Sequence, residues 1–337
     1  MAQSQSALLG WLSRRTHRRT RLVSDLRHAA AASPSGPCST KGCSWSALCK
    51  RGRTRRRCRG RCFSRTREKE TVVKTLTFLN QKGGVWKTTT AVTVAHGLAL
   101  QGRDVLLVDL DAQGNVADAL GMSALKKSGE ADGLYELLIR ERGLQAVRPS
   151  GRPRLDVILG HKKTLQAKQI LAGMDFREYL LRNALAEIAS EYDVCLLDVA
   201  PGVDVLQIGA LVAADFFVIP VALSHLAVVG AMDALGTVVS LQKVGAFRGK
   251  FLGVLPTHWE RQTNESDLQL RAMAQQFKRL VWPAIPMDPR AKEAPRLGKT
   301  LWEYAPKGRA IRGIRINDKY HGGYQRGLAR LVQEVGL

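Results

Sequence analysis

The segment from Asn80 to Thr90 constrains the fold of this 337-residue chain more than any other feature. It reads Asn-Gln-Lys-Gly-Gly-Val-Trp-Lys-Thr-Thr-Thr, and it lies between an apolar, β-branched run that ends at Leu79 and an apolar helical pattern that begins at Ala91. A strand, a glycine-containing loop, a lysine followed by hydroxyl residues, and a helix form the order that a phosphate-binding loop requires. The alternative is an ordinary glycine turn before a helix, but other segments of the chain supply the remaining parts of a nucleotide site.

Each residue type in this loop suits phosphate binding. Gly83 and Gly84 let the backbone approach closely, so that consecutive N–H groups can point at phosphate oxygens. The helix that begins near Lys87 adds the positive end of its dipole. We expect Lys87 to neutralise the β- and γ-phosphates and the Thr88 hydroxyl to ligate Mg²⁺. The predicted nucleotide-binding residues are Lys82, Gly83, Gly84, Val85, Trp86, Lys87, Thr88 and Thr89.

Two residues of the loop are unusual. Lys82 is a second lysine, five positions before Lys87, and Trp86 stands where the general pattern has glycine. If the loop requires a positive φ at this position, tryptophan costs about 1–2 kcal/mol there. The indole is too large for the phosphate cradle, so we expect it to point away, toward a dimer seam or a neighbouring helix. A protein that binds nucleotide but hydrolyses it poorly is the alternative that Trp86 suggests.

Six segments resemble, in order, those of the ParA/Soj chromosome- and plasmid-partition ATPases, a branch of the P-loop proteins that also contains MinD. Residues 82–89 resemble the deviant Walker A loop of that family. Residues 105–115 resemble its second motif, with Ala112 in place of the usual proline, and residues 192–201 resemble its Walker B segment. The later matches are residues 218–221, 257–264 and 285–299. The resemblance runs from about Lys74 to the C-terminus.

The resemblance implies roles for individual residues in a Mg²⁺-dependent ATPase. Asp111 matches the residue that orients the attacking water, and Asp109 matches one that supports the metal. Lys82 matches the signature lysine that reaches across an ATP-bound homodimer to the phosphates of the partner, which makes it catalytic together with Asp111. Asp198 ends an apolar run, so its carboxylate is expected in the Mg²⁺ region with Thr88 and Asp109, although a turn aspartate is the simpler alternative.

The resemblance also implies macromolecular partners. Arg290 matches an arginine that contacts DNA in Soj-like proteins, whereas the second such arginine falls on Gln262, next to Arg261. Arg296, Lys299, Lys307 and Arg309 are expected to extend this basic surface in the dimer, with a merely solvated basic surface as the alternative. The expected partners are non-specific DNA, a ParB-type centromere-binding protein that triggers hydrolysis, and a second copy of the chain. The expected location is the cytoplasm, on the nucleoid.

Charge divides the chain near residue 70. Residues 1–70 have a net charge of +15 and residues 71–337 a net charge of +8, so both parts favour a polyanionic partner. We expect residues 1–70 to form a disordered extension, because they lack a sustained apolar period, and residues 71–337 to form the ATPase domain. The extension is a nucleic-acid-binding arm, a transit peptide, or upstream codons in front of a true start near Thr71. Five of the six cysteines lie in it without a spacing typical of zinc sites.

Apolar strands alternate with amphipathic helices after residue 73. Strands are expected near residues 74–79, 104–109, 155–159, 194–199, 216–221, 251–255 and 282–285. Helices are expected near residues 88–101, 132–141, 175–190, 205–213, 226–243, 264–279 and 322–335. This order predicts a doubly wound α/β fold with a mainly parallel sheet.

No apolar run is long enough to span a membrane, and no membrane partner is expected. A regulator recruited to membranes, like MinD, is the remaining alternative. It would need a basic amphipathic C-terminal helix, whereas residues 327–337 contain one arginine and are expected to pack on the domain.

Overall fold

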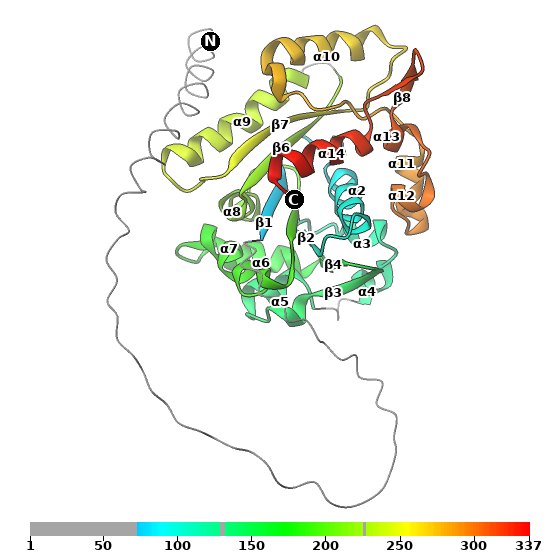
Figure 1. The fold of residues 1–337 in the computed structure, drawn as a ribbon. Coiled ribbons are helices and arrows are strands. Elements are labelled where there is room, and N and C mark those ends of the chain that lie inside the picture. The colour runs from blue at the N-terminus through cyan, green and yellow to red at the C-terminus, as the bar shows by residue number, and fades with distance from the viewer. Residues whose placement is uncertain (1–72, 129–131, 225–226) are drawn as a thin grey trace, which may run out of the picture. The chain divides into compact units, whose positions relative to one another are not determined.

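The computed structural model describes residues 73–128, 132–224 and 227–337. The basic segment 1–70, with its predicted arm and its cysteines, lies outside the described residues. The part of the chain from residue 73 onward is built around one seven-stranded sheet with the strand order β3-β4-β2-β5-β1-β6-β7. Neighbouring strands are parallel except for the antiparallel pair β3 and β4 at one edge (Figure 1). The strands are β1 Lys74–Phe78, β2 Val105–Asp109, β3 Arg148–Arg152, β4 Leu155–Ile158, β5 Val194–Asp198, β6 Phe216–Ala222 and β7 Lys250–Thr257.

Helices cover both faces of this sheet because successive residues of the buried strands point in opposite directions. In β2, Val105 and Leu107 pack into the core beneath α2, α3 and α14, whereas Leu106 and Val108 pack against α5, α7 and α8. The helices are α2 Lys87–Leu100, α3 Asn115–Ala119, α4 Ser123–Ser128, α5 Leu134–Ile139, α6 Lys163–Ala172, α7 Arg177–Ala186, α8 Val205–Ala213, α9 Ala227–Lys243, α10 Asn264–Phe277, α11 Arg290–Glu293, α12 Leu301–Tyr304, α13 Arg309–Arg312 and α14 Tyr324–Val335.

The predicted doubly wound fold is confirmed, with one strand in error. Residues 282–285 do not form a regular strand; they run beside the end of β7 with isolated bridges on either side, Val254 to Val281 and Trp259 to Pro286. Pro283 and Pro286 lack an N–H group, so the ladder cannot continue through this segment. The sequence patterns also missed β3, a hairpin of β8 Ile314–Ile316 with β9 Lys319–His321, and the helices α3, α4, α6, α11, α12 and α13.

The C-terminal helix α14 packs on the domain, as expected. Tyr324, Leu328 and Leu331 are buried in the core cluster that contains α2, and the Tyr324 hydroxyl lies 2.9 Å from the Thr90 hydroxyl. Its apolar side is therefore already used in folding, which removes the feature that a MinD-like membrane helix requires. None of the helices in the described residues has the length and hydropathy needed to span a bilayer.

Candidate nucleotide-binding site

Three central strands bring the predicted nucleotide- and metal-binding residues together at the carboxyl ends of the strands. β1 leads into the phosphate loop, β2 ends at Asp109, and β5 ends at Asp198. In the strand register Asp198 lies opposite both Phe78 of β1 and Asp109 of β2. Carboxyl ends of parallel strands are where ligands bind in such sheets, because the loops that leave these ends diverge around a crevice.

Buried polar contacts fix the shape of the loop between β1 and α2. The Asn80 side chain donates to the carbonyl of Pro220 in β6 at 2.7 Å, and it accepts from the backbone N–H of Lys82 at 2.9 Å. On the other side, the Thr257 hydroxyl at the end of β7 donates to the carbonyl of Val85 at 3.3 Å. The loop is thus held by β6 and β7, so its backbone N–H groups are arranged before any ligand binds.

Lys87 and Thr88 occupy the first turn of α2. The Lys87 side chain is buried, and its ammonium donates to the carbonyl of Lys82 at 2.9 Å. Burial lowers the pKa of Lys87, while the nearby carboxylates of Asp198 and Asp111 act in the opposite direction. The other lysine of the loop, Lys82, has an exposed side chain. The two lysines therefore differ: one faces the interior of the site and the other faces outward.

Asp198 is completely buried, and neither of its carboxylate oxygens makes a hydrogen bond of good geometry with the described residues, although the Thr88 hydroxyl lies close. Burial raises its pKa to about 7, and the nearby Thr88 hydroxyl and Lys87 ammonium oppose this rise. A buried carboxylate without donors is costly unless a cation or a proton satisfies it. Beside a threonine hydroxyl at a phosphate loop, this carboxylate fits Mg²⁺, which proteins hold through one or two carboxylates together with substrate phosphates. The described residues contain no group of three or more His, Cys, Asp or Glu side chains that would hold a metal without the nucleotide.

Asp109 and Asp111 have different surroundings, although they are two residues apart. Asp109 is buried and uses both carboxylate oxygens within its own loop, accepting from the N–H groups of Asp111 at 3.0 Å and Val116 at 3.3 Å. Burial and the neighbouring Asp198 raise the pKa of Asp109 well above its usual value. Asp111 is half-buried, and it accepts from the Gln113 N–H at 2.9 Å. Asp109 thus shapes the loop that presents Asp111.

Sequence patterns did not identify Gly160, which follows β4 and lies against this loop. A Cβ atom at position 160 would lie 2.2 Å from the Asp111 carbonyl oxygen and 3.1 Å from the Asp109 carboxyl carbon. Any side chain there would displace the loop. A glycine has no chemical signature, so only the packed structure connects it with the site.

Trp86 adopts the left-handed conformation that the general loop pattern assigns to glycine, with φ 63° and ψ 35°. The indole is only 9% exposed and packs against the His258 ring, with 4.2 Å between ring centroids. It therefore points away from the cradle, as expected, but it is buried beneath the loop that follows β7. The packing of the indole against His258 offsets the energetic cost of the left-handed backbone at Trp86.

A cavity of about 470 Å³ adjoins the phosphate loop. It lies between the loops that follow β6 and β7 and the start of α10, and it is lined by Gly84, Leu223, Ser224, His258, Glu260, Thr263, Ser266 and Met287, among others. Part of this wall is residues 257–264, the segment already matched to the family pattern. A mainly apolar wall with a few polar side chains, next to a phosphate loop, makes this cavity suitable for the base and sugar of a nucleotide.

The predicted DNA-binding residues lie on the part of the chain that follows β7. Arg261, Arg296 and Lys299 are exposed. Arg290 instead donates through Nε to Oδ1 of the buried Asp288 at 2.8 Å, so its guanidinium is partly neutralised and held in one position. None of these four cationic residues lines the cavity beside the phosphate loop.

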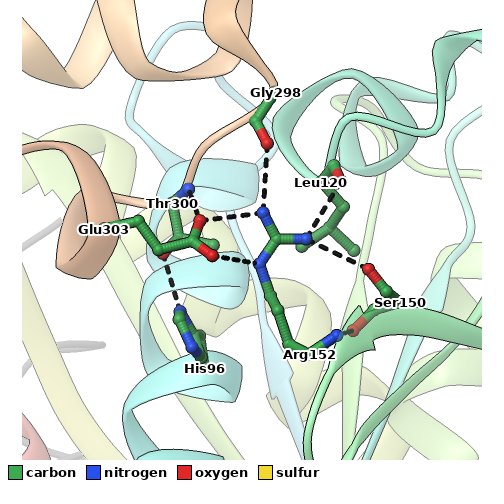
Figure 2. A network of polar contacts seen from close by, with 7 residues as sticks. All are labelled: His96, Leu120, Ser150, Arg152, Gly298, Thr300 and Glu303. Atoms are coloured by element: carbon green, nitrogen blue, oxygen red, sulfur yellow. Dashed lines mark hydrogen bonds and ion pairs between the residues drawn. The ribbon is translucent and has the colours of Figure 1, made fainter.

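Arg152 connects the segment that contains Arg296 and Lys299 to the nucleotide core (Figure 2). This β3 side chain is 10% exposed, and it forms a bidentate ion pair with Glu303 at 2.8 and 2.9 Å. It also donates to the carbonyls of Leu120, which follows α3, and Gly298. Glu303 completes the network by accepting from the Thr300 N–H, and the Thr300 hydroxyl lies 2.7 Å from Nδ1 of His96 in α2.

Comparison with known proteins supports a nucleotide-binding site at the ends of β1, β2 and β5. The model of a family described as an AAA domain matches residues 73–248. The chromosome-partitioning ATPase Soj of Thermus thermophilus is 36% identical over 69% of this chain and 89% of its own length. The sporulation initiation inhibitor protein Soj of Bacillus subtilis is 34% identical over 70% of this chain and 93% of its own length.

A solved structure shares the fold. The ATP complex of a McdA protein from Cyanothece superposes with a TM-score of 0.67 and 26% sequence identity, and it covers 79% of this chain and 98% of the McdA chain.

Proposed function

This chain belongs to the ParA/Soj family of P-loop ATPases, and from that membership we propose that it is a Mg·ATP-dependent DNA-partition ATPase. The observation that supports this most directly is Asp198, a buried carboxylate that makes no hydrogen bond of good geometry with the described residues and lies beside Lys87 and Thr88. Such a carboxylate is stable in a site that regularly receives a cation, and the cation of a phosphate loop is the Mg²⁺ of a nucleotide.

Binding of Mg·ATP would use the residues of the loop and of the neighbouring strand ends. The N–H groups of residues 83–89 and the Lys87 ammonium would hold the phosphates, and Thr88 and Asp198 would hold Mg²⁺, with Asp109 in support. When bound, Mg²⁺ supplies charge neutralisation for the phosphate oxygens. The cavity beside Gly84 would take the base and sugar.

Hydrolysis would depend on positioning and charge, because phosphoryl transfer needs little covalent chemistry from the protein. Asp111 would orient the attacking water from the loop that Asp109 and Gly160 shape. Lys82, exposed on the loop, would reach the phosphates of a second copy when ATP brings two chains together. A cation that arrives only in the dimer makes turnover dependent on assembly.

DNA would bind to the ATP-bound dimer without sequence preference, and a ParB-type partner would stimulate hydrolysis and release. Support comes from the partition proteins among the relatives and from the net charge of +8 on residues 71–337. Residues Arg261, Arg290, Arg296 and Lys299 are the proposed contacts, with Arg290 positioned by Asp288.

The test is DNA binding by the full chain with Mg·ATP, with Mg·ADP and without nucleotide, together with ATP turnover. The charge of residues 1–70 contributes equally in all three states, so only a difference between them reports the switch. We expect tight binding with ATP alone. Equal affinity in the three states refutes the proposal, and ATP binding without any turnover would instead favour the hydrolysis-impaired protein that Trp86 suggests.

A further inference from the structure

The hairpin of β8 and β9 is a well-formed element that the nucleotide site does not use. Its strands pair antiparallel, with Arg315 opposite Tyr320 and Ile316 opposite Lys319. The two residues of the turn, Asn317 and Asp318, have φ values of 45° and 61°. A two-residue hairpin turn of the primed type requires positive φ at both positions, and Asn and Asp tolerate it well. The sequence of the turn is thus suited to this short ribbon.

The root of the hairpin is fixed to the domain. Ile314 and Ile316 pack against the core cluster between β6, β7, α9 and α10. A Cβ atom at Gly322 would lie 2.0 Å from the Ala284 carbonyl oxygen, and the same carbonyl accepts from the Gly323 N–H at 2.9 Å. Because the root has no room to shift, the ribbon holds its side chains in a defined place.

The surface of the ribbon is basic. Since side chains alternate along a strand, Arg315 points to the side opposite Ile314 and Ile316, and its side chain is 64% exposed. Lys319 is opposite Ile316 in the register and so lies on the other side of the ribbon from Arg315, but it too is exposed, as are Arg309 and Arg312 of the preceding helix α13. Residues 307–321 have a formal net charge of +4. Their single acid, Asp318, pairs with Arg315 at 2.8 Å but is 90% exposed, and such pairs are weak in water.

One buried carboxylate joins this basic element to the predicted DNA-binding arginine. Oδ1 of Asp288 accepts from Arg290, and Oδ2 accepts from the Ala310 N–H in α13 at 3.2 Å. Arg290 and α13 therefore both donate hydrogen bonds to the same side chain, Asp288. Strand β8 follows α13 after one residue. Labels α11, α13 and β8 lie together at one side of the domain in Figure 1. Since Asp288 partly neutralises Arg290, unpaired positive charge at this place must come from its neighbours.

We propose that α13 and the β8–β9 ribbon form a further phosphate-backbone contact for duplex DNA, adjacent to Arg290; this rests on the proposed function. Phosphates attract cations on a rigid support regardless of base sequence. A lipid surface fits less well, because the isoleucines of the ribbon face the core and Tyr320, 41% exposed, is the single large apolar side chain that the ribbon presents to solvent. An acidic protein partner is the other polyanion, and the test separates it from DNA.

The experiment measures binding of the full chain to duplex DNA over a range of salt concentrations, in all three nucleotide states. The test variant is Arg315→Gln with Lys319→Gln. The matched control is Lys243→Gln with Arg248→Gln, which makes the same charge change at exposed positions before β7, whereas the hairpin packs near the end of β7. Each lost phosphate contact should make the log–log salt slope shallower by about 0.9, so the ribbon variant should lose up to about 1.8 and the control none. ATP affinity should be unchanged in both.

A third variant tests the opposite direction. Asp318→Asn keeps a residue that tolerates the left-handed turn, removes the acid beside Arg315, and should strengthen DNA binding severalfold. Equal salt slopes for the ribbon and control variants would overturn this proposal. It would also be overturned if the ribbon variant lost binding to poly-glutamate while its DNA binding stayed intact. The proposed function is judged separately, by whether ATP changes DNA binding of the parent protein; a ribbon effect together with equal affinity of the parent in the three nucleotide states would support the ribbon while refuting the switch.

Discussion

Replacing Trp86 by glycine restores the residue of the general loop pattern, yet we expect it to destabilise this protein. The left-handed backbone at Trp86 costs about 1–2 kcal/mol for a residue other than glycine, and glycine removes that cost. Trp86 is only 9% exposed and its indole packs at a tilt against the His258 ring, and truncation of such a core aromatic costs about 3–5 kcal/mol. Burial therefore exceeds strain, and Trp86→Gly should lower the free energy of unfolding by about 1–4 kcal/mol.

Urea unfolding of the parent, Trp86→Gly and Trp86→Ala measures both contributions. Alanine loses the indole but keeps the unfavourable left-handed backbone, so it should be less stable than the glycine variant by about 1 kcal/mol. Addition of ATP to the parent should change Trp86 emission, since the indole adjoins the phosphate loop. A glycine variant as stable as the parent would refute the reasoning, because it would mean that the indole packing contributes no more than the strain costs. An alanine variant equal to the glycine variant would show that the backbone at this position is not left-handed.

Three further predictions concern the site and its support. Lys87→Ala should abolish ATP binding in calorimetry, because the phosphates lose their buried cation, whereas Asp111→Ala should keep ATP affinity and stop turnover; ATP affinity for Lys87→Ala equal to that of the parent would refute the assignment. Arg152→Met should lower the free energy of unfolding by about 3 kcal/mol, since it removes the guanidinium partner of Glu303 and the donor to the carbonyls of Leu120, Ser150 and Gly298; a loss below about 1 kcal/mol would make this pair an ordinary surface pair. Burial and the nearby Lys292 lower the pKa of His258 to about 4, so its neutral form is favoured on folding and stability should fall as the pH drops from about 6.5 to about 4. His258→Gln should flatten that part of the pH–stability curve, and an unchanged curve would remove His258 as its cause.

Sequence patterns alone predicted the fold class and most of the helices and strands. Short apolar runs separated by amphipathic stretches indicated the parallel sheet, and six of the seven expected strands are present. The strand expected at residues 282–285 failed for a local reason, since Pro283 and Pro286 cannot donate to a ladder. The edge strand β3 and the β8–β9 hairpin were missed because both are short and largely polar, so they have no strong period of their own.

The sequence also determined the candidate site as a set of residue types in order. A lysine and a threonine after a glycine loop, and aspartates at two strand ends, have a chemistry that can be recognised before any coordinates are known. Asp198 needed the register of β5 with β1 and β2 to be placed beside the loop, but the apolar run before it had already indicated the end of a buried strand.

The differences between these residues in burial and hydrogen bonding became apparent only from the folded structure. It showed Asp109 occupied by backbone N–H groups while Asp198 has none, and it placed Trp86 in a left-handed conformation against His258, 172 residues away in the chain. It also showed that Arg290 and α13 both donate to the buried carboxylate of Asp288. Burial, hydrogen-bond partners and electrostatic surroundings depend on contacts between segments distant in sequence, and those contacts exist only after the chain has packed.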